Sequence, residues 1–249
     1  MKKRILYFHG FNGSPRGQRY GLLTRAGYQV DAPELPFARS RSKQLLNGIM
    51  DPRRWGHLLG LREATHQALE SLEADRPDAI VATSLGCAVA LSLGVTDIPM
   101  VLLAPAWNGG LNPAELIRLR FGRHRETHLA QGSSLLGSGL LALMLAKQAW
   151  PDLAQASAPL VVLHDAQDEV VPIAQTEHLI AGYGRPQGGW TPNFLEMLHR
   201  EVDHSASRVN GCQITIQEGQ PPHHPMHGPT AQQTLLKVLE CLSTAISRG

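Results

Sequence analysis

Short apolar runs alternate along the chain with longer segments that have the periodicity of a helix. Polar, Gly or Pro residues end each apolar run, as expected for strands that stop at turns. Runs that are apolar throughout are typical of parallel strands buried on both faces. The predicted strands are residues 5–8, 28–32, 79–82, 100–104, 160–163 and 212–217, the last through the alternation of Ile214 and Ile216.

Helical patterns fill most of the intervals between these runs. Apolar positions step by three and four through 58–72 and 235–246, and 172–183 opens with Pro172, which a first helical turn tolerates. Gly27 can close another helix just before the second strand. Strand–helix alternation over residues 1–249 predicts one α/β domain. We expect a doubly wound, mainly parallel sheet with helices on both faces.

Two stretches are too long to be simple connections between these elements. Residues 107–152 contain helix-like pieces and predict a helical lid, and residues 185–210 predict an irregular insertion. Long insertions on the loop face of such sheets often act as lids or binding loops.

Composition excludes several classes of protein. Of the 249 residues, 43% are hydrophobic, which is enough for a sizeable core and rules out a disordered chain. The formal net charge of +2 is too balanced for a dedicated nucleic-acid binder. Cysteine occurs 3 times, at scattered positions without metal-ligand spacing (Cys87, Cys212 and Cys241). This odd number argues against a disulfide framework and favours a reducing cytoplasm.

No segment has the pattern of a targeting signal or a membrane span. The basic start is followed only by the apolar run 5–8, shorter than the roughly 7–15 residues of a secretory apolar region. The apolar stretch 135–146 is shorter than the roughly 18–20 residues of a membrane span. We therefore expect a soluble, cytoplasmic protein.

The segment from Ala79 to Leu91, with Ala-x-Ser-x-Gly at residues 82–86, carries the strongest chemical signal. It reads as a buried strand, a sharp turn at Ser84, and a helix of small residues. A nucleophile on such an elbow needs small neighbours, because the turn is strained and packs tightly. The N-terminus of the helix would place backbone N–H groups beside a developing oxyanion. The alternative is an ordinary strand-to-helix turn in which Ser84 caps the helix.

The first predicted strand runs into His9-Gly10-Phe11. Such a turn can leave the Phe11 N–H free at the carboxyl edge of the sheet. Together with the N–H of Leu85 it would form an oxyanion hole with two donors. A plain glycine turn is an equally good interpretation of this segment alone.

An acidic loop follows the strand 160–163 and precedes a helix. A carboxylate there can orient a histidine and stabilise its cation. We choose Asp168, because it stands in Asp-x-Val-Val-Pro just before the helix, whereas Asp165 is more simply a polar end to the strand. Beyond the last strand, a proline-rich loop presents His223, His224 and His227 as candidates for a general base.

These segments occur in the chain order Ser…Asp…His used by one class of hydrolases. The sequence resembles the α/β-hydrolase family over nearly its whole length, above all small bacterial serine esterases whose first strand runs into His-Gly-Phe-Asn-x-Ser-Pro. The resemblance implies a serine nucleophile at Ser84, Asp168 as the acid, a C-terminal histidine as the base, and no metal or other cofactor. The chain departs from the family pattern at Ala82, Cys87 and Asp165.

The base is assigned by a second resemblance. His224-Pro225-Met226-His227-Gly228 is similar to the His-Phe-Phe-His-Gly of related small hydrolases, in which the first histidine is catalytic. Pro225 biases His224 towards an extended conformation, which suits a side chain held over the strand ends. We therefore expect His224 to be the base. His227 is the alternative, and His223 is expected to be a solvated neighbour.

The function predicted from the sequence is hydrolysis of a small-molecule carboxylic ester or thioester through an acyl-enzyme on Ser84. The same residues could act on a peptide, lactone or carbon–carbon bond, and a non-catalytic binding protein with a hydrolase fold is the alternative from another class. Metal is not expected, because His124 and His128, and the cluster 223–227, lack completing ligands at helpful spacing. The sequence does not indicate an oligomeric state.

Overall fold

The computed structural model of the chain describes residues 2–10, 13–35, 61–95, 97–107, 158–165, 168, 171–182, 212–216 and 229–248. The predicted lid and the irregular insertion fall outside these ranges, apart from Trp107 at the start of the lid. The described elements are β1 (Arg4–Phe8), α1 (Gln18–Arg25), β2 (Gln29–Asp31), α3 (Leu61–Ala74), β3 (Ala79–Thr83), α4 (Gly86–Ser92), β4 (Met100–Leu103), β5 (Leu160–Asp165), α7 (Ala174–Gly182), β6 (Cys212–Ile216) and α9 (Pro229–Arg248).

The described strands form one 6-stranded sheet in the order β2-β1-β3-β4-β5-β6. Every neighbouring pair is parallel, as the apolar runs predicted. The chain moves outward from β1 to β2, returns past β1 to β3, and then continues in the opposite direction. Ligands of open α/β sheets bind outside the carboxyl ends of the strands at such a reversal. The ends of β1 and β3 are therefore the expected place for a site.

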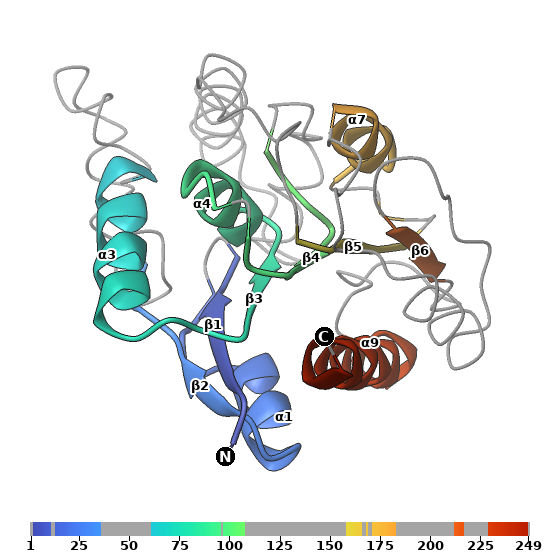
Figure 1. The fold of residues 1–249 in the computed structure, drawn as a ribbon. Coiled ribbons are helices and arrows are strands. Elements are labelled where there is room, and N and C mark those ends of the chain that lie inside the picture. The colour runs from blue at the N-terminus through green and yellow to red at the C-terminus, as the bar shows by residue number, and fades with distance from the viewer. Residues whose placement is uncertain are drawn as a thin grey trace, which may run out of the picture.

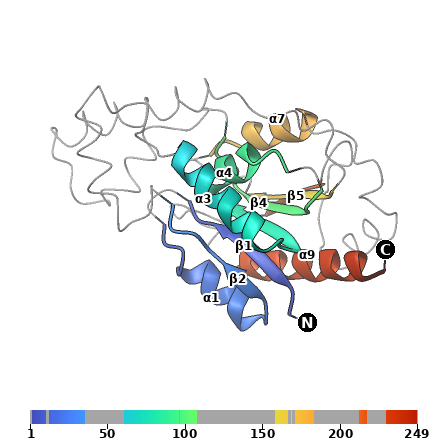
Figure 2. The ribbon, with the colours of Figure 1, turned by 60° about the vertical axis from the view of Figure 1, so that its left-hand side comes forward.

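Helices cover both faces of the sheet (Figure 1). Helices α3, α4 and α7 lie on one face, and α1 and α9 lie on the other, an arrangement that the rotated view also shows (Figure 2). The sheet is buried between these layers, and every residue of β3, β4 and β5 is buried. This explains why these strands are apolar almost throughout rather than alternating. The doubly wound architecture predicted from the sequence is confirmed.

Helix ends agree with the sequence signals in most places. Gly27, with φ of 93°, follows the last turn of α1 in the left-handed conformation that glycine favours. Helix α7 differs from the prediction, because it begins at Ala174 rather than at Pro172. The N–H of Gln175 donates to the Pro172 carbonyl at 2.9 Å, so a tight turn precedes the helix. In the part of the chain that is described, no helix has both the length and the apolar character needed to cross a membrane.

Candidate active site

Ser84 stands at a sharp turn between β3 and α4. Its φ of 51° lies in the left-handed region, which a residue with a side chain rarely adopts. Its N–H donates to the Leu103 carbonyl at 2.9 Å, and its carbonyl accepts from the N–H groups of Cys87 (2.9 Å) and Ala106 (3.2 Å). Backbone bonds on both sides thus hold the strained residue in place.

Two glycines make room for this turn. A Cβ on Gly86 would lie 2.5 Å from the Phe8 carbonyl oxygen and 2.6 Å from that of His9. A Cβ on Gly10 would lie 3.0 Å from the Cβ of Ser84. The end of β1 and the two residues after it therefore pack directly against the elbow. This brings His9-Gly10 and Ser84, which the sequence analysis singled out separately, together at the strand reversal.

The side chain of Ser84 is half-buried. The residue at the N-cap position of α4 is Leu85, and it makes no side-chain capping bond. Ser84 itself has no side-chain hydrogen bond within the described part of the chain, so helix capping does not explain the serine here. Ala82, where the family pattern has glycine, is fully buried in β3 and is accommodated there.

His9 holds the turn that follows β1. Its side chain is buried, its Nε2 accepts from the Leu35 N–H at 3.4 Å, and its Nδ1 therefore carries the proton donated to the Gly10 carbonyl at 2.9 Å. Burial lowers the pKa of His9, and the Gly10 carbonyl and the charge of Glu34 oppose this shift only partly. The Gly13 N–H also donates to Gly10, at 3.0 Å. Phe11, the predicted oxyanion donor, lies outside the described residues.

Asp168 is buried after the end of β5. Its Oδ1 accepts from the Val171 N–H at 2.9 Å, and its own N–H donates to the Asp165 carbonyl at 3.2 Å. Both bonds are local, so they fix the carboxylate between the strand and the turn before α7. Asp165 is the last residue of β5, which makes it the polar end to the strand that we expected.

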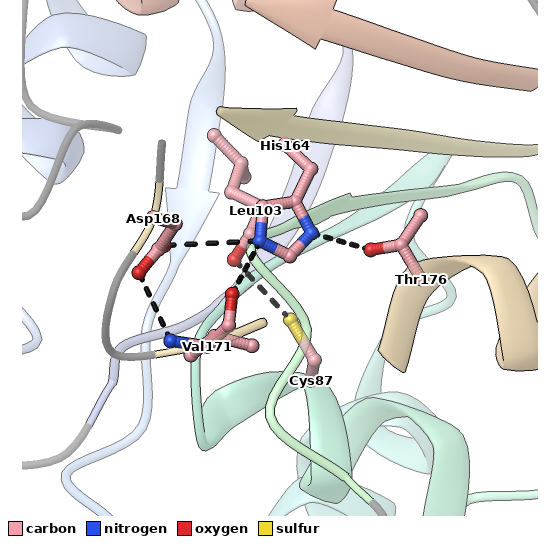
Figure 3. A network of polar contacts seen from close by, with 6 residues as sticks. All are labelled: Cys87, Leu103, His164, Asp168, Val171 and Thr176. Atoms are coloured by element: carbon pink, nitrogen blue, oxygen red, sulfur yellow. Dashed lines mark hydrogen bonds and ion pairs between the residues drawn. The ribbon is translucent and has the colours of Figure 1, made fainter. Parts of the chain in front are cut away.

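A fully buried histidine, His164, lies beside this carboxylate (Figure 3). Its Nε2 lies 2.8 Å from the Val171 carbonyl and 3.8 Å from Asp168 Oδ2, and its Nδ1 lies 2.5 Å from Thr176 Oγ1. A carbonyl can only accept, so Nε2 carries the proton and Nδ1 accepts from the Thr176 hydroxyl. Burial lowers the pKa of His164, although the charge of Asp168 opposes this shift.

His164 is a residue that the sequence analysis missed. One ring nitrogen is engaged by the Val171 carbonyl before α7 and the other by the Thr176 hydroxyl within α7, so His164 ties the end of β5 to this helix and neither nitrogen is free to take a proton from Ser84. The available signal was a histidine at the end of an otherwise apolar run. Arg19 was missed for a similar reason: it shares the buried stripe of α1 with Leu23, four positions away, where a charge is unusual. Its Nη1 donates to Thr83 Oγ1 at 2.8 Å.

The start of the predicted lid is anchored to α7. The backbone N–H of Trp107 donates to Gln175 Oε1 at 3.1 Å, and its indole N–H donates to the Gln175 carbonyl at 3.1 Å. The Trp107 ring also meets His178 edge-on, with 5.7 Å between ring centroids. Two hydrogen bonds and a ring contact thus fix Trp107, the described residue at the start of the predicted lid, against α7.

The predicted bases His224 and His227, and their neighbour His223, lie outside the described residues. So do His124 and His128. Within the described ranges, no group of three or more His, Cys, Asp or Glu side chains could hold a metal ion. The buried Cys87 places its Sγ 3.7 Å from the Leu103 carbonyl, and burial raises the pKa of its thiol, so it serves as a packing residue.

Comparison with solved structures identifies the fold. A protein of Xanthomonas campestris assigned to the α/β hydrolase superfamily is similar with a TM-score of 0.53 at 15% identity, over 98% of this chain and 99% of that one. The fold is that of the α/β hydrolases. The ydeN gene product of Bacillus subtilis has a TM-score of 0.54 at 13% identity, covering 98% of this chain and all (100%) of its own.

A Thermus thermophilus protein is similar at 21% identity, with a TM-score of 0.54 over 97% of this chain and 89% of that one. No family model and no curated protein sequence matches the chain. At these identities the likeness shows the α/β-hydrolase fold alone.

Proposed function

We propose that the protein is a serine hydrolase that cleaves a carboxylic ester or thioester through an acyl-enzyme on Ser84. The observation that carries the proposal is the left-handed backbone of Ser84, with φ of 51°, between a buried strand and a helix. This conformation costs free energy, and such strain is typical of functional residues. The strained turn also stands beside Gly10, at the strand reversal where α/β sheets bind ligands.

We assign the base to His224, with His227 as the alternative. Neighbouring strands lie about 4.8 Å apart, so the ends of β3 and β5 are about 10 Å apart across β4. One imidazole with a hydrogen bond at each nitrogen spans about 8 Å, so it can join a serine after β3 to a carboxylate after β5. The segment that contains His224 and His227 follows β6 in the sequence, and β6 neighbours β5 in the sheet. His164 is not available for this role, because its own contacts use both ring nitrogens.

The proposed reaction follows from these positions. The base takes the proton of the Ser84 hydroxyl while Oγ attacks the acyl carbon, and the oxyanion accepts from the N–H groups of Leu85 and Phe11. The imidazolium, held by Asp168, then protonates the leaving alcohol or thiol as the bond to it breaks. Water, activated by the same base, attacks the acyl-enzyme and releases the acid, which restores the Ser84 hydroxyl.

A fluorophosphonate probe tests the proposal. Intact-mass and peptide analysis should show one label, on Ser84, and p-nitrophenyl esters of graded chain length should be hydrolysed. Ser84→Ala should remove both labelling and turnover, with activity falling by at least about 10³-fold. Ser92→Ala is the matched control, because Ser92 lies in α4 and its hydroxyl donates to the Ala88 carbonyl of the same helix at 2.7 Å. An unlabelled Ser84, or a Ser84→Ala variant retaining more than about a tenth of the activity, refutes the assignment.

The same experiment separates the alternatives. A non-catalytic binding protein would neither react with the probe nor turn over any ester. Labelling of Ser84 without hydrolysis of any ester or thioester would favour a peptide, lactone or carbon–carbon bond as the natural substrate. Thioesters of graded acyl length then define which leaving group and chain length the site accepts.

A further inference from the structure

Arg19 is a charged side chain in the interior of the domain. It lies in the first turn of α1, and only 4% of its surface is exposed. A guanidinium remains charged in proteins, and moving it out of water is costly unless polar groups compensate. Burial accordingly lowers the pKa of Arg19 from its ordinary value. A side chain with this cost is not explained by packing alone.

The guanidinium bridges the two strands that meet at the proposed site. Its Nη1 donates to Thr83 Oγ1 at 2.8 Å, and it also forms a hydrogen bond with the side chain of Tyr7. Tyr7 belongs to β1, and Thr83 is the last residue of β3, directly before Ser84. Arg19 therefore acts across the strand reversal and holds the residue that precedes the strained turn.

The positive charge also reaches the far side of the elbow. Arg19 lowers the pKa of the Cys87 thiol, which partly offsets the larger upward shift from burial, so the charge of Arg19 is felt at the start of α4 although the thiol itself stays neutral. The N–H of Cys87 donates to the Ser84 carbonyl at 2.9 Å. The groups that respond to Arg19 thus lie on both sides of Ser84 in the sequence.

We propose that Arg19 is a positioning residue of the serine site, which braces the elbow through Thr83 and sets a buried positive charge beside it. This inference rests on the proposed function of Ser84. A left-handed serine persists only where its surroundings over-determine it, and the bond to Thr83 is one such restraint. A positive charge in a water-poor region favours the negative charge that develops on the substrate oxygen.

Four variants separate this role from simple packing. Arg19→Met removes the charge and the donors, Arg19→Lys keeps the charge, and Thr83→Val removes the acceptor while keeping the shape. Arg25→Met is the matched control, because Arg25 is an exposed cation at the other end of α1. Hydrolysis of p-nitrophenyl butyrate is measured per site titrated with fluorophosphonate. Inhibition by phenylboronic acid, which forms a tetrahedral anion on a serine, is measured in parallel.

We expect Arg19→Met to lower kcat about 10- to 100-fold, with KM changed less than about twofold. Boronic acid inhibition should weaken by a similar factor, and Arg19→Lys should recover part of both losses. Thr83→Val should lower kcat by a smaller factor. The double variant Arg19→Met/Thr83→Val should have the same kcat as Arg19→Met, because both substitutions remove the same Arg19–Thr83 hydrogen bond. Arg25→Met should behave like the unaltered protein.

Titrated Arg19→Met protein with kcat and boronic acid inhibition both within about twofold of the unaltered protein overturns the inference. If Arg19→Met does not fold, Arg19→Lys and Thr83→Val decide: full kcat in both variants overturns it equally. Failure of the proposed function has a different signature, because the unaltered protein would then carry no label on Ser84. That result would overturn both proposals together.

Discussion

Ser84 and Ala104 occupy matching positions at the ends of neighbouring strands, and both have a left-handed backbone. Thr83 of β3 is paired with Leu103 of β4, and the residues that follow have φ of 51° and 45°. The turn at Ala104 lets the N–H of Ala106 reach the Ser84 carbonyl at 3.2 Å. One strained turn therefore braces the other, and the elbow depends on β4 as well as on its own helix.

The first prediction concerns the strain at Ala104. Replacing this residue with glycine loses a buried methyl group but relieves about 1–2 kcal/mol of left-handed strain. Ala106 is equally buried and has no positive φ, so Ala106→Gly loses the methyl and backbone entropy without relief. We expect Ala104→Gly to be less destabilising than Ala106→Gly by about 1–2 kcal/mol. Urea unfolding measures both, and equal losses would contradict the interpretation.

The second prediction concerns the approach of α4 to β1. Gly86→Ala would place a Cβ 2.5 Å from the Phe8 carbonyl oxygen, and backbone cannot move aside cheaply. We expect a loss of about 3 kcal/mol or more in the free energy of unfolding, together with loss of Ser84 labelling. Gly21→Ala is the control: its Cβ would meet only the end of the Arg25 side chain, at 3.2 Å. That variant should gain about 0.5–1 kcal/mol, because alanine favours a helix.

The third prediction is the pH dependence of stability. Burial lowers the pKa values of His9 and His164, so near pH 5–6.5 the unfolded chain binds protons that the native state does not. Stability should be constant just above the ordinary imidazole pKa of about 6.5 and fall as the pH drops through the window below it. Each histidine contributes a slope of up to about 1.4 kcal/mol per pH unit.

His164→Gln tests the contribution of one of these histidines. Glutamine can donate to the Val171 carbonyl but does not titrate, so the slope of stability below pH 6.5 should decrease in this variant. His66→Gln, at a position where 74% of the side chain is exposed, is the control. Urea midpoints between pH 5 and 8 give the slopes. An unchanged slope in His164→Gln would show that His164 already binds a proton in the native state.

The fourth prediction identifies the base. His224→Ala should abolish turnover, whereas His227→Ala should retain most of it, because we assign proton transfer to the imidazole of His224. In the unaltered protein, kcat/KM should rise with pH through a value near the ordinary imidazole pKa of about 6.5, displaced by the charge of Asp168. Full activity in His224→Ala with loss in His227→Ala would reverse the assignment.

The strands of the sheet could be predicted from the sequence because their signals are local. Each buried strand is an apolar run closed by turn residues, and β1, β3 and β4 fall where these runs occur. The elbow at Ser84 was also predictable, since the small residues around it and the strand before it are neighbours in the chain. Strand β5 extends beyond its apolar run to Asp165, because the ladder to β6 continues through His164.

Local signals could not reveal contacts between distant segments. Arg19 donates to Thr83 only because α1 packs on the face of the sheet towards which the Thr83 side chain points. His164 meets Thr176 only after the loop before α7 folds back over the strand end. A polar residue in an otherwise apolar pattern, such as Arg19 or His164, indicates a buried polar contact, but the sequence does not show which distant residue it contacts.

The sequence by itself determined the alternation of strands and helices, the order of the chemical segments, and the serine at the sharp turn, because all of these depend on residues adjacent in the chain. Only the tertiary structure decided that Gly10 lies against Ser84 and that Ala104 shares its strain. These relationships depend on β1 standing beside β3, and β3 beside β4. Strand order is set by packing over the whole sheet, so no single segment encodes it.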